Sequence, residues 1–234
     1  MDFAFIASIL PRLFDGALVT LMLLGLSVCA GLVFAVPIGL ARLSWNPLLW
    51  LPAYAYIFFF RGTPLLVQIF LIYYGLGQFE AVRASLLWPV LREAFWCAVI
   101  ALTLNTAGYT AEILRGAIQA VPRGEIEAAR ALGMSRGMIL RRIILPKAVR
   151  LGLPAYQNEV IFMLKGTALV FTITVVDLMG AANLVRARTF RVYEPLLAAA
   201  TIYLAITFVL TRVFAFVEHR LHPDRRRPAS TSPS

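Results

Sequence analysis

Charged side chains are scarce in this sequence. They make up 15% of its 234 residues, whereas 60% are hydrophobic and the mean hydropathy is +0.79. Because soluble domains carry roughly a quarter charged residues, this balance is that of an integral membrane protein. The charges are also unbalanced, with 22 basic against 12 acidic residues. The basic residues flank apolar runs, which indicates cytoplasmic loops and contact with anionic lipid rather than nucleic acid.

Cysteine, histidine and lysine are rarer still. Cys29 and Cys97 lie in separate apolar runs, so we interpret them as small packing residues with no disulfide or metal motif. Neither of the two lysines follows a glycine, which excludes a P-loop, so any energy from ATP must come from a partner. No catalytic set of side chains falls in an apolar run, and the two histidines lie on a basic tail. The sequence therefore predicts no enzyme, cofactor or metal site in this chain.

Long apolar runs predict about five membrane crossings, each of about 20 helical residues. The expected spans are 16–41, 54–77, 94–111, 151–176 and 195–211, within a transmembrane domain of residues 16–217. Residues 1–15 are expected to form an external lead, 79–93 and 177–194 external loops, and 218–234 a cytoplasmic, basic and disordered tail.

Orientation follows from the basic residues. Residues 112–150 carry eight of them, so the positive-inside rule places this loop in the cytoplasm. Five spans then put the N-terminus outside and the C-terminus in the cytoplasm. Loop 177–194 opposes the rule because it holds three arginines, but the 112–150 loop and the C-terminus outweigh it.

The second span is irregular. Leu48–Phe60 is apolar but short, and Arg61 interrupts it. We expect an interfacial approach followed by a single span that Pro64 kinks. Arg61 is either an anchor whose charge reaches the interface or a residue of the solute path.

Polar side chains inside the predicted spans mark a candidate solute path, because polar groups in hydrocarbon need partners. Asn105 is expected to face inwards, either in a helix–helix hydrogen bond or in the solute site. Glu159 and Lys165 are six residues apart and so about 120° apart around a helix, too far for a simple ion pair. The candidate path residues are Asn105, Glu159, Lys165, Thr167, Thr172 and Asp177.

The polar segment Glu127–Pro146 reads EAARALGMSRGMILRRIILP. It predicts a short helix that begins after Pro122, a break at Gly133 and a second helix capped by Ser135. One apolar face of the first helix is expected from residues at three-residue spacing: Ile126, Ala129 and Leu132.

This segment matches EAA-x3-G-x9-I-x-LP, the signature of ABC-importer permease subunits. Arg61–Gln68, Asn158–Val160 and Lys165–Thr167 resemble recurring stretches of its polar amino-acid branch, the permeases for histidine, lysine/arginine/ornithine and opines. The resemblance runs from about Arg61 to the end of the last span. It implies an all-α, five-span type I importer fold.

The resemblance also implies a function. The chain would be the permease subunit of an ATP-driven, binding-protein-dependent importer in the bacterial inner membrane, for polar, cationic amino acids or opines. Its partners would be a cytoplasmic ATPase dimer, which holds ATP and Mg, a second permease and an external solute-binding protein. The residues implied to couple to the ATPase are Glu127, Ala128, Ala129, Leu132, Gly133, Ile143, Leu145 and Pro146.

Carboxylates such as Glu159 and Asp177 would suit a cationic solute, while Lys165 could equally meet a carboxylate. The same three residues leave open an ion-gradient-driven secondary transporter or channel. Such transporters usually contain inverted repeats with paired broken helices. Five spans do not divide into equal halves and no repeat is visible, which counts against this alternative.

Overall fold

The computed structural model describes residues 2–221, and the regular elements within this range are all helical. They are α1 (Phe3–Arg42), α2 (Pro47–Gly62), α3 (Leu65–Phe70), α4 (Glu80–Arg83), α5 (Trp88–Leu91), α6 (Ala94–Gln119), α7 (Arg123–Ala131), α8 (Arg136–Ile139), α9 (Leu145–Gly166), α10 (Leu178–Thr189) and α11 (Tyr193–Leu221). Two π segments, Leu71–Gly75 and Leu140–Ile144, and two 3₁₀ segments, Leu76–Gln78 and Thr167–Ile173, extend these helices.

Three of these helices, α1, α6 and α11, are long and apolar enough to cross a membrane. The number rises to five when two bent pairs are each counted as one span. One pair is α2 with residues 65–78, and the other is residues 136–173 with α10. The prediction of an all-α membrane fold with about five spans is confirmed.

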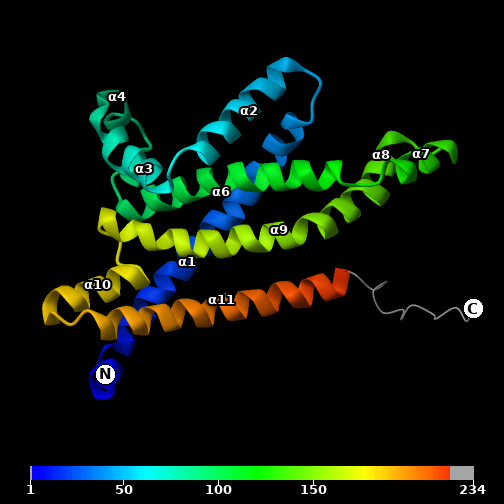
Figure 1. The fold of residues 1–234 in the computed structure, drawn as a ribbon. Helices are drawn as coiled ribbons and strands as arrows, with labels where there is room; N and C mark the ends of the chain where they lie inside the picture. The colour runs from blue at the N-terminus through cyan, green and yellow to red at the C-terminus, as the bar shows by residue number, and fades with distance from the viewer. Residues whose placement is uncertain (1, 222–234) are drawn as a thin grey trace, which may run out of the picture.

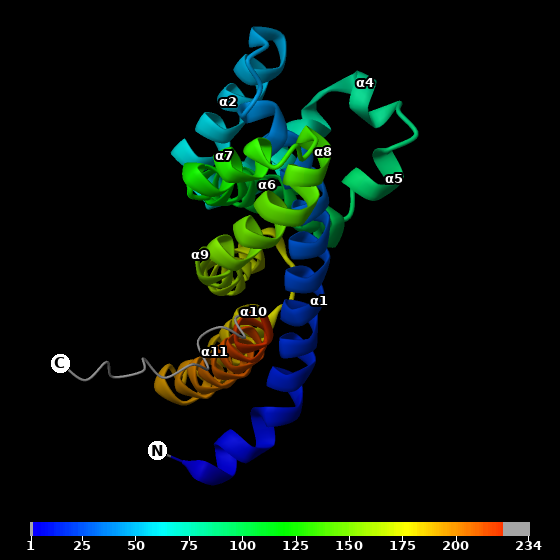
Figure 2. The same cartoon turned by 90° about the vertical axis from the view of Figure 1, so that its right-hand side faces the viewer.

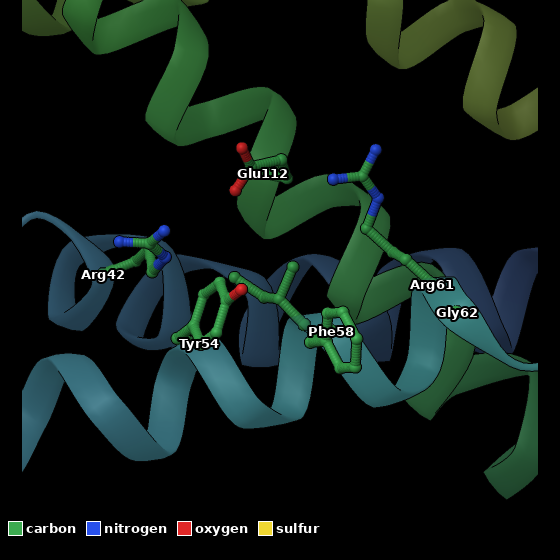
Figure 3. A pocket seen from close by; sticks show the side chains of 7 residues that line it. Arg42, Tyr54, Phe58, Arg61, Gly62 and Glu112 are labelled. Atoms are coloured by element: carbon green, nitrogen blue, oxygen red, sulfur yellow. The ribbon is translucent and has the colours of Figure 1, made fainter.

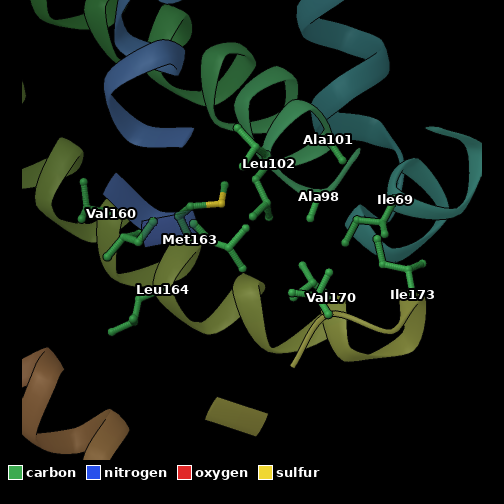
Figure 4. Close-up of a cluster of buried hydrophobic side chains, with 13 residues drawn as sticks. Ile69, Ala98, Ala101, Leu102, Val160, Met163, Leu164, Val170 and Ile173 are labelled. Atoms are coloured by element: carbon green, nitrogen blue, oxygen red, sulfur yellow. The ribbon is translucent and has the colours of Figure 1, made fainter. Parts of the chain in front are cut away.

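Helix α6 lies at the centre of the molecule, where it packs against α1, α2, α3 and α9. In Figure 1, α6, α9 and α11 run across the view one below another, and α1 crosses behind them. Figure 2 shows α1 passing along the side of this stack. The largest cluster of buried side chains joins α6 to α3 and α9 (Figure 4), and it includes Ile69, Leu102 and Leu164. As predicted, Asn105 of α6 is buried, and the nearby Thr103 is buried as well.

Helix α1 begins earlier than the predicted first span. Its 40 residues correspond to about 60 Å, roughly twice the hydrocarbon thickness. Residues 3–15, expected to form a lead, are thus a helical extension of the span. Asp2 caps this helix by accepting a hydrogen bond from the Phe5 amide and pairs with Arg191 at 2.9 Å. Both contacts lower the pKa of Asp2.

The prediction of a loop over 177–194 was wrong for most of that segment, because residues 178–189 form α10. Its buried face, which includes Leu178, Ala181 and Ala182, packs against α1 and α11. Arg186 and Arg188 lie on the exposed side. The arginines that suggested a loop therefore occupy one side of an amphipathic helix.

Helix α11 extends beyond the predicted fifth span to Leu221, so residues 218–221 of the predicted tail are helical. The remainder of that tail, 222–234, lies outside the described residues. The fourth span also begins earlier than predicted, because residues 136–173 are continuously helical through the π segment Leu140–Ile144.

Candidate functional site

A sharp break separates α2 from α3 and shapes one wall of a cavity inside the membrane domain. The axes of the two helical stretches differ by 107°. Thr63 takes an extended conformation, φ −111° and ψ 146°, as expected for a residue before proline. The predicted kink at Pro64 is confirmed, but it is large enough to turn the chain rather than only to bend one span.

The break leaves a backbone carbonyl without its helical partner. Phe60 O would accept from the amide four residues on, but that residue is Pro64, which has no N–H. Two side-chain amides replace it: Gln68 Nε2 donates to Phe60 O at 2.9 Å, and Asn105 Nδ2 donates to the same oxygen at 3.3 Å. Asn105 also donates to Gln68 Oε1 at 2.9 Å. Asn105 thus makes the helix–helix hydrogen bond that was one of its two expected roles, and the network fixes the broken segment against α6.

The cavity beside this break has a volume of about 580 Å³. Its walls come from the break, from one stripe of α6 and from one face of α9. The spacing of four residues along α6 and of three or four along α9 places each set on one side of its helix. The lining residues are Thr63, Pro64, Leu65, Asn105, Tyr109, Ile113, Ala155, Asn158, Glu159, Phe162 and Met163.

Glu159 is the only acidic residue on this wall, and its side chain is 7% exposed. Its Oε1 accepts a hydrogen bond from Thr106 Oγ1 at 2.9 Å. The other carboxylate oxygen accepts no hydrogen bond from a described residue. A carboxylate with one oxygen bonded to a hydroxyl and the other left for a ligand is suited to binding a cationic group.

The structure brings together two of the six predicted path residues, Asn105 and Glu159. Lys165 is exposed at the end of α9, where its Nζ lies 5.8 Å from the centre of the Phe162 ring. Thr167 and Thr172 each donate to a carbonyl of the preceding helical turn. These three residues do not line the cavity.

Asp177 has a structural position instead. It is fully buried at the start of α10, where its Oδ1 accepts from the Gly180 amide at 2.8 Å. The Tyr203 hydroxyl donates to its Oδ2 at 3.2 Å. Both carboxylate oxygens are therefore used within the protein, by a helix cap and by a neighbouring helix.

Most of the remaining lining residues were missed by sequence reasoning. Tyr109 and Ile113 follow Asn105 at four-residue intervals, and Phe162 and Met163 continue the α9 face from Glu159. Helical periodicity starting from the polar residues could have found them. Thr63 and Leu65 could not be found in this way, because they reach the cavity only through the turn of the chain at Pro64.

The second candidate site is the segment α7–α8, which projects beyond the ends of α6 and α9 (Figure 1). Helix α7 begins directly after Pro122, as predicted. Gly133 follows it with φ +76°, the left-handed region that glycine adopts without strain. Ser135 then caps α8 by accepting from the Met138 amide. These three predictions are confirmed.

The faces of α7 differ in exposure. Ala129 is 3% exposed, and Ile126 packs against a buried cluster that includes Ala148 of α9. Leu132, predicted on this apolar face, is 81% exposed. The reason is that α7 ends at Ala131, so the chain leaves the helix before Leu132 can join the stripe. Glu127, Ala128 and Gly133 are exposed as well.

Helix α7 is also held by charge, because Lys147 at the start of α9 forms an ion pair with Glu125 of α7. Ile143 lies in the π segment before α9, and Leu145 and Pro146 are the first residues of α9. The implied coupling residues thus form two groups. One group lies on α7 and just after it and is mostly exposed, and the other lies where the π segment joins α9.

Comparison with known proteins places this architecture in a family. The family described as binding-protein-dependent transport system inner membrane component matches residues 27–223. The chain belongs to this family. It is thus a transport subunit of the ABC permease type and not an enzyme. Family membership also decides against the ion-gradient alternative, since these systems work with a binding protein and a separate ATPase.

Similar proteins cover nearly the whole chain. The octopine transport system permease protein OccM of Rhizobium meliloti is 51% identical, over 92% of this chain and 88% of its own length. The nopaline transport system permease protein NocM of Agrobacterium fabrum is 46% identical, over 100% of this chain and 98% of its own length. The histidine/lysine/arginine/ornithine transport system permease protein HisM of Escherichia coli is 46% identical, over 88% of this chain and 87% of its own length.

The fold agrees with solved permeases. A crystal structure of an amino acid ABC transporter with histidines superposes with a TM-score of 0.84 at 38% identity, over 94% of this chain and 99% of that one. The inward-facing MetNI methionine ABC transporter gives a TM-score of 0.73 at 18% identity, over 90% and 96%, which supports the fold alone. The expected type I importer fold is confirmed.

Proposed function

We propose that this permease subunit imports cationic amino acids or opines, with Glu159 as the residue that recognises positive charge. The observation that carries the proposal is the free carboxylate oxygen of Glu159 in the wall of a 580 Å³ cavity. The names of the relatives point the same way, because they include lysine, arginine and ornithine, whose side chains carry a positive charge. Asn105 and Asn158 supply further polar groups on the same wall.

A pair of solutes of equal shape tests this role. Arginine and citrulline differ mainly in side-chain charge, so the wild-type importer should prefer arginine. Glu159→Gln keeps the shape of the side chain and removes its charge. We expect the ratio of arginine uptake to citrulline uptake to fall at least about tenfold in this variant, which corresponds to about 1.4 kcal/mol. Glu80→Gln, which removes an exposed carboxylate on α4, is the control. An unchanged preference in Glu159→Gln would overturn the assignment.

We further propose that α7 lies in the cytoplasm and docks into the ATPase. Its inner face packs on the membrane domain, while Glu127, Ala128, Leu132 and Gly133 are exposed together. When ATP closes the ATPase dimer, α7 moves and carries α9 with it through the Glu125–Lys147 pair. Because α9 also carries Glu159, this movement changes access to the cavity.

The assembly proposed contains a second permease, identical or homologous, two ATPase subunits and an external solute-binding protein. Copurification from the host membrane tests the docking face. An ATPase should accompany the wild-type chain and be lost from Glu127→Lys and Gly133→Arg, while Glu80→Lys retains it. If all four chains bring down the same amount of ATPase, α7 is not the docking element.

A further inference from the structure

A second cavity, of about 280 Å³, lies between α1, α2 and α6, apart from the proposed solute site. Its walls share no residue with that site. Figure 3 shows Arg42 and Arg61 at its two ends, with Glu112 between them. The lining residues are Arg42, Tyr54, Ile57, Phe58, Arg61, Gly62 and Glu112.

The cavity has an excess of positive charge. Glu112 is already neutralised by Arg115, whose Nε donates to both of its carboxylate oxygens at 3.0 Å. Neither Arg42 nor Arg61 forms an ion pair with a described residue. Arg42 Nε is moreover buried without a hydrogen-bond acceptor in the described part of the chain. A buried donor of this kind is costly unless something supplies an acceptor.

Arg42 is held in place by aromatic rings. Its guanidinium carbon lies 4.8 Å from the centre of the Trp50 ring and 4.9 Å from that of Tyr54. These two rings are themselves stacked, with centres 5.3 Å apart. Stacking on ring faces orients the planar guanidinium while its charge stays available. Arg42 is therefore fixed at the cavity without using its hydrogen-bonding capacity on the protein.

The surface next to the cavity is apolar. The elbow between α1 and α2 exposes Trp45 completely and Leu48 to 82%, and Phe58 on the cavity wall is 68% exposed. In a membrane protein, exposed tryptophan and leucine at the end of a span lie at the boundary between headgroups and acyl chains. This elbow places Arg42, the last residue of α1, at headgroup depth.

We propose that this cavity binds the phosphate group of an anionic lipid, with Arg42 as its main ligand and Arg61 as a second positive charge. A guanidinium matches phosphate oxygens in geometry as well as in charge. Basic pockets between transmembrane helices are known sites for anionic headgroups. The occupied site would tie the α1–α2 elbow to α6. The proposal does not depend on which solute the importer carries.

Native mass spectrometry of the purified chain tests the site without measuring transport. In one arm, delipidated protein is titrated with phosphatidylglycerol, and in the other with inorganic phosphate. Arg42→Gln should weaken binding about tenfold or more, Arg61→Gln less, and Arg42→Lys should retain part of it. Arg212→Gln is the matched control, since Arg212 also lies over an aromatic ring, that of Phe208, but outside the cavity.

The two arms distinguish the source of the phosphate. We expect phosphatidylglycerol to bind the wild-type protein and inorganic phosphate not to displace it, which identifies a lipid headgroup. Binding of inorganic phosphate that Arg42→Gln abolishes would support a phosphate site with a soluble ligand. If Arg42→Gln and Arg212→Gln bind as the wild-type chain does in both arms, the proposal is overturned.

Discussion

Gly31 on α1 lies against Thr106, the residue whose hydroxyl donates to Glu159. A Cβ at Gly31 would lie 2.3 Å from Cγ2 of Thr106, whose hydroxyl holds the Glu159 carboxylate. Two carbon atoms need about 3.5 Å or more, so the threonine methyl group must move by more than about 1 Å. In Gly31→Ala the Thr106 side chain must rotate or the two helices must separate, and either change withdraws the hydroxyl from Glu159.

Gly31→Ala changes three contributions to the free energy. Loss of a hydrogen bond to a charged group costs about 1.5–3 kcal/mol, and overpacking costs about 1–3 kcal/mol. Alanine gains about 1 kcal/mol over glycine in a helix, which offsets part of this. The overpacking and helix-propensity terms change folding stability, whereas KM for a cationic solute depends on the hydrogen bond. At about 1.4 kcal/mol per tenfold, loss of about 1.5–3 kcal/mol should raise this KM roughly tenfold to a hundredfold. Gly25→Ala, on the same helix with open space around the new Cβ, should leave KM unchanged.

A double variant separates the clash from other effects of alanine. Thr106→Ser removes the methyl group and retains the hydroxyl, so Gly31→Ala with Thr106→Ser should restore KM. The assay is initial-rate uptake of labelled arginine by cells that express the importer, at matched amounts of membrane-inserted protein. Equal KM values for Gly31→Ala and Gly25→Ala, or a KM that Thr106→Ser does not restore, would show that the Gly31–Thr106 contact does not position Glu159.

Three further outcomes are expected. Gly133→Asn should still copurify with the ATPase, whereas Gly133→Val should not, because asparagine tolerates the left-handed region and valine is strained there by about 1–2 kcal/mol. If both variants retain the ATPase equally, the φ of +76° is not needed for docking. Asp177→Ala should lower stability in thermal unfolding by about 1–3 kcal/mol and leave KM for solute unchanged, because Asp177 caps α10; a selective change in KM would return it to the solute path. Glu125→Lys should weaken coupling of ATP hydrolysis to uptake, and Lys147→Glu in the same chain should restore it; failure of the pair to restore coupling would mean that the contact does not transmit movement.

The segment α7–α8 could be predicted closely because its signals are local. Pro122, Gly133 and Ser135 each act on the backbone within a few residues, by a missing amide, a left-handed conformation and a side-chain cap. The burial of Asn105 was predictable for a similar reason, since a polar side chain in a span needs a partner. The identity of that partner could not be predicted, because Phe60 O becomes available only through the break at Pro64.

Other features depend on contacts between distant parts of the chain. Arginines made residues 178–189 resemble a loop, but the buried face of α10 is complementary to α1 and α11. Asp177 resembled a path residue because a carboxylate near a span suggests function, and its cap and Tyr203 contacts appear only in three dimensions. The prediction that Leu132 lies on the apolar face of α7 was wrong for a local reason. The helix ends one residue earlier, at Ala131, and this leaves the Leu132 side chain exposed.

Reconstituted uptake tests whether this permease imports cationic solutes with energy from ATP and with Glu159 as the charge-recognising residue. The permease, its partner permease, the ATPase and the binding protein are placed in vesicles with labelled arginine outside, and ATP is present or absent on the ATPase side. We expect accumulation only with both ATP and binding protein, and in Glu159→Gln a smaller preference for arginine over citrulline. Accumulation without ATP, or an unchanged preference in Glu159→Gln, would contradict it.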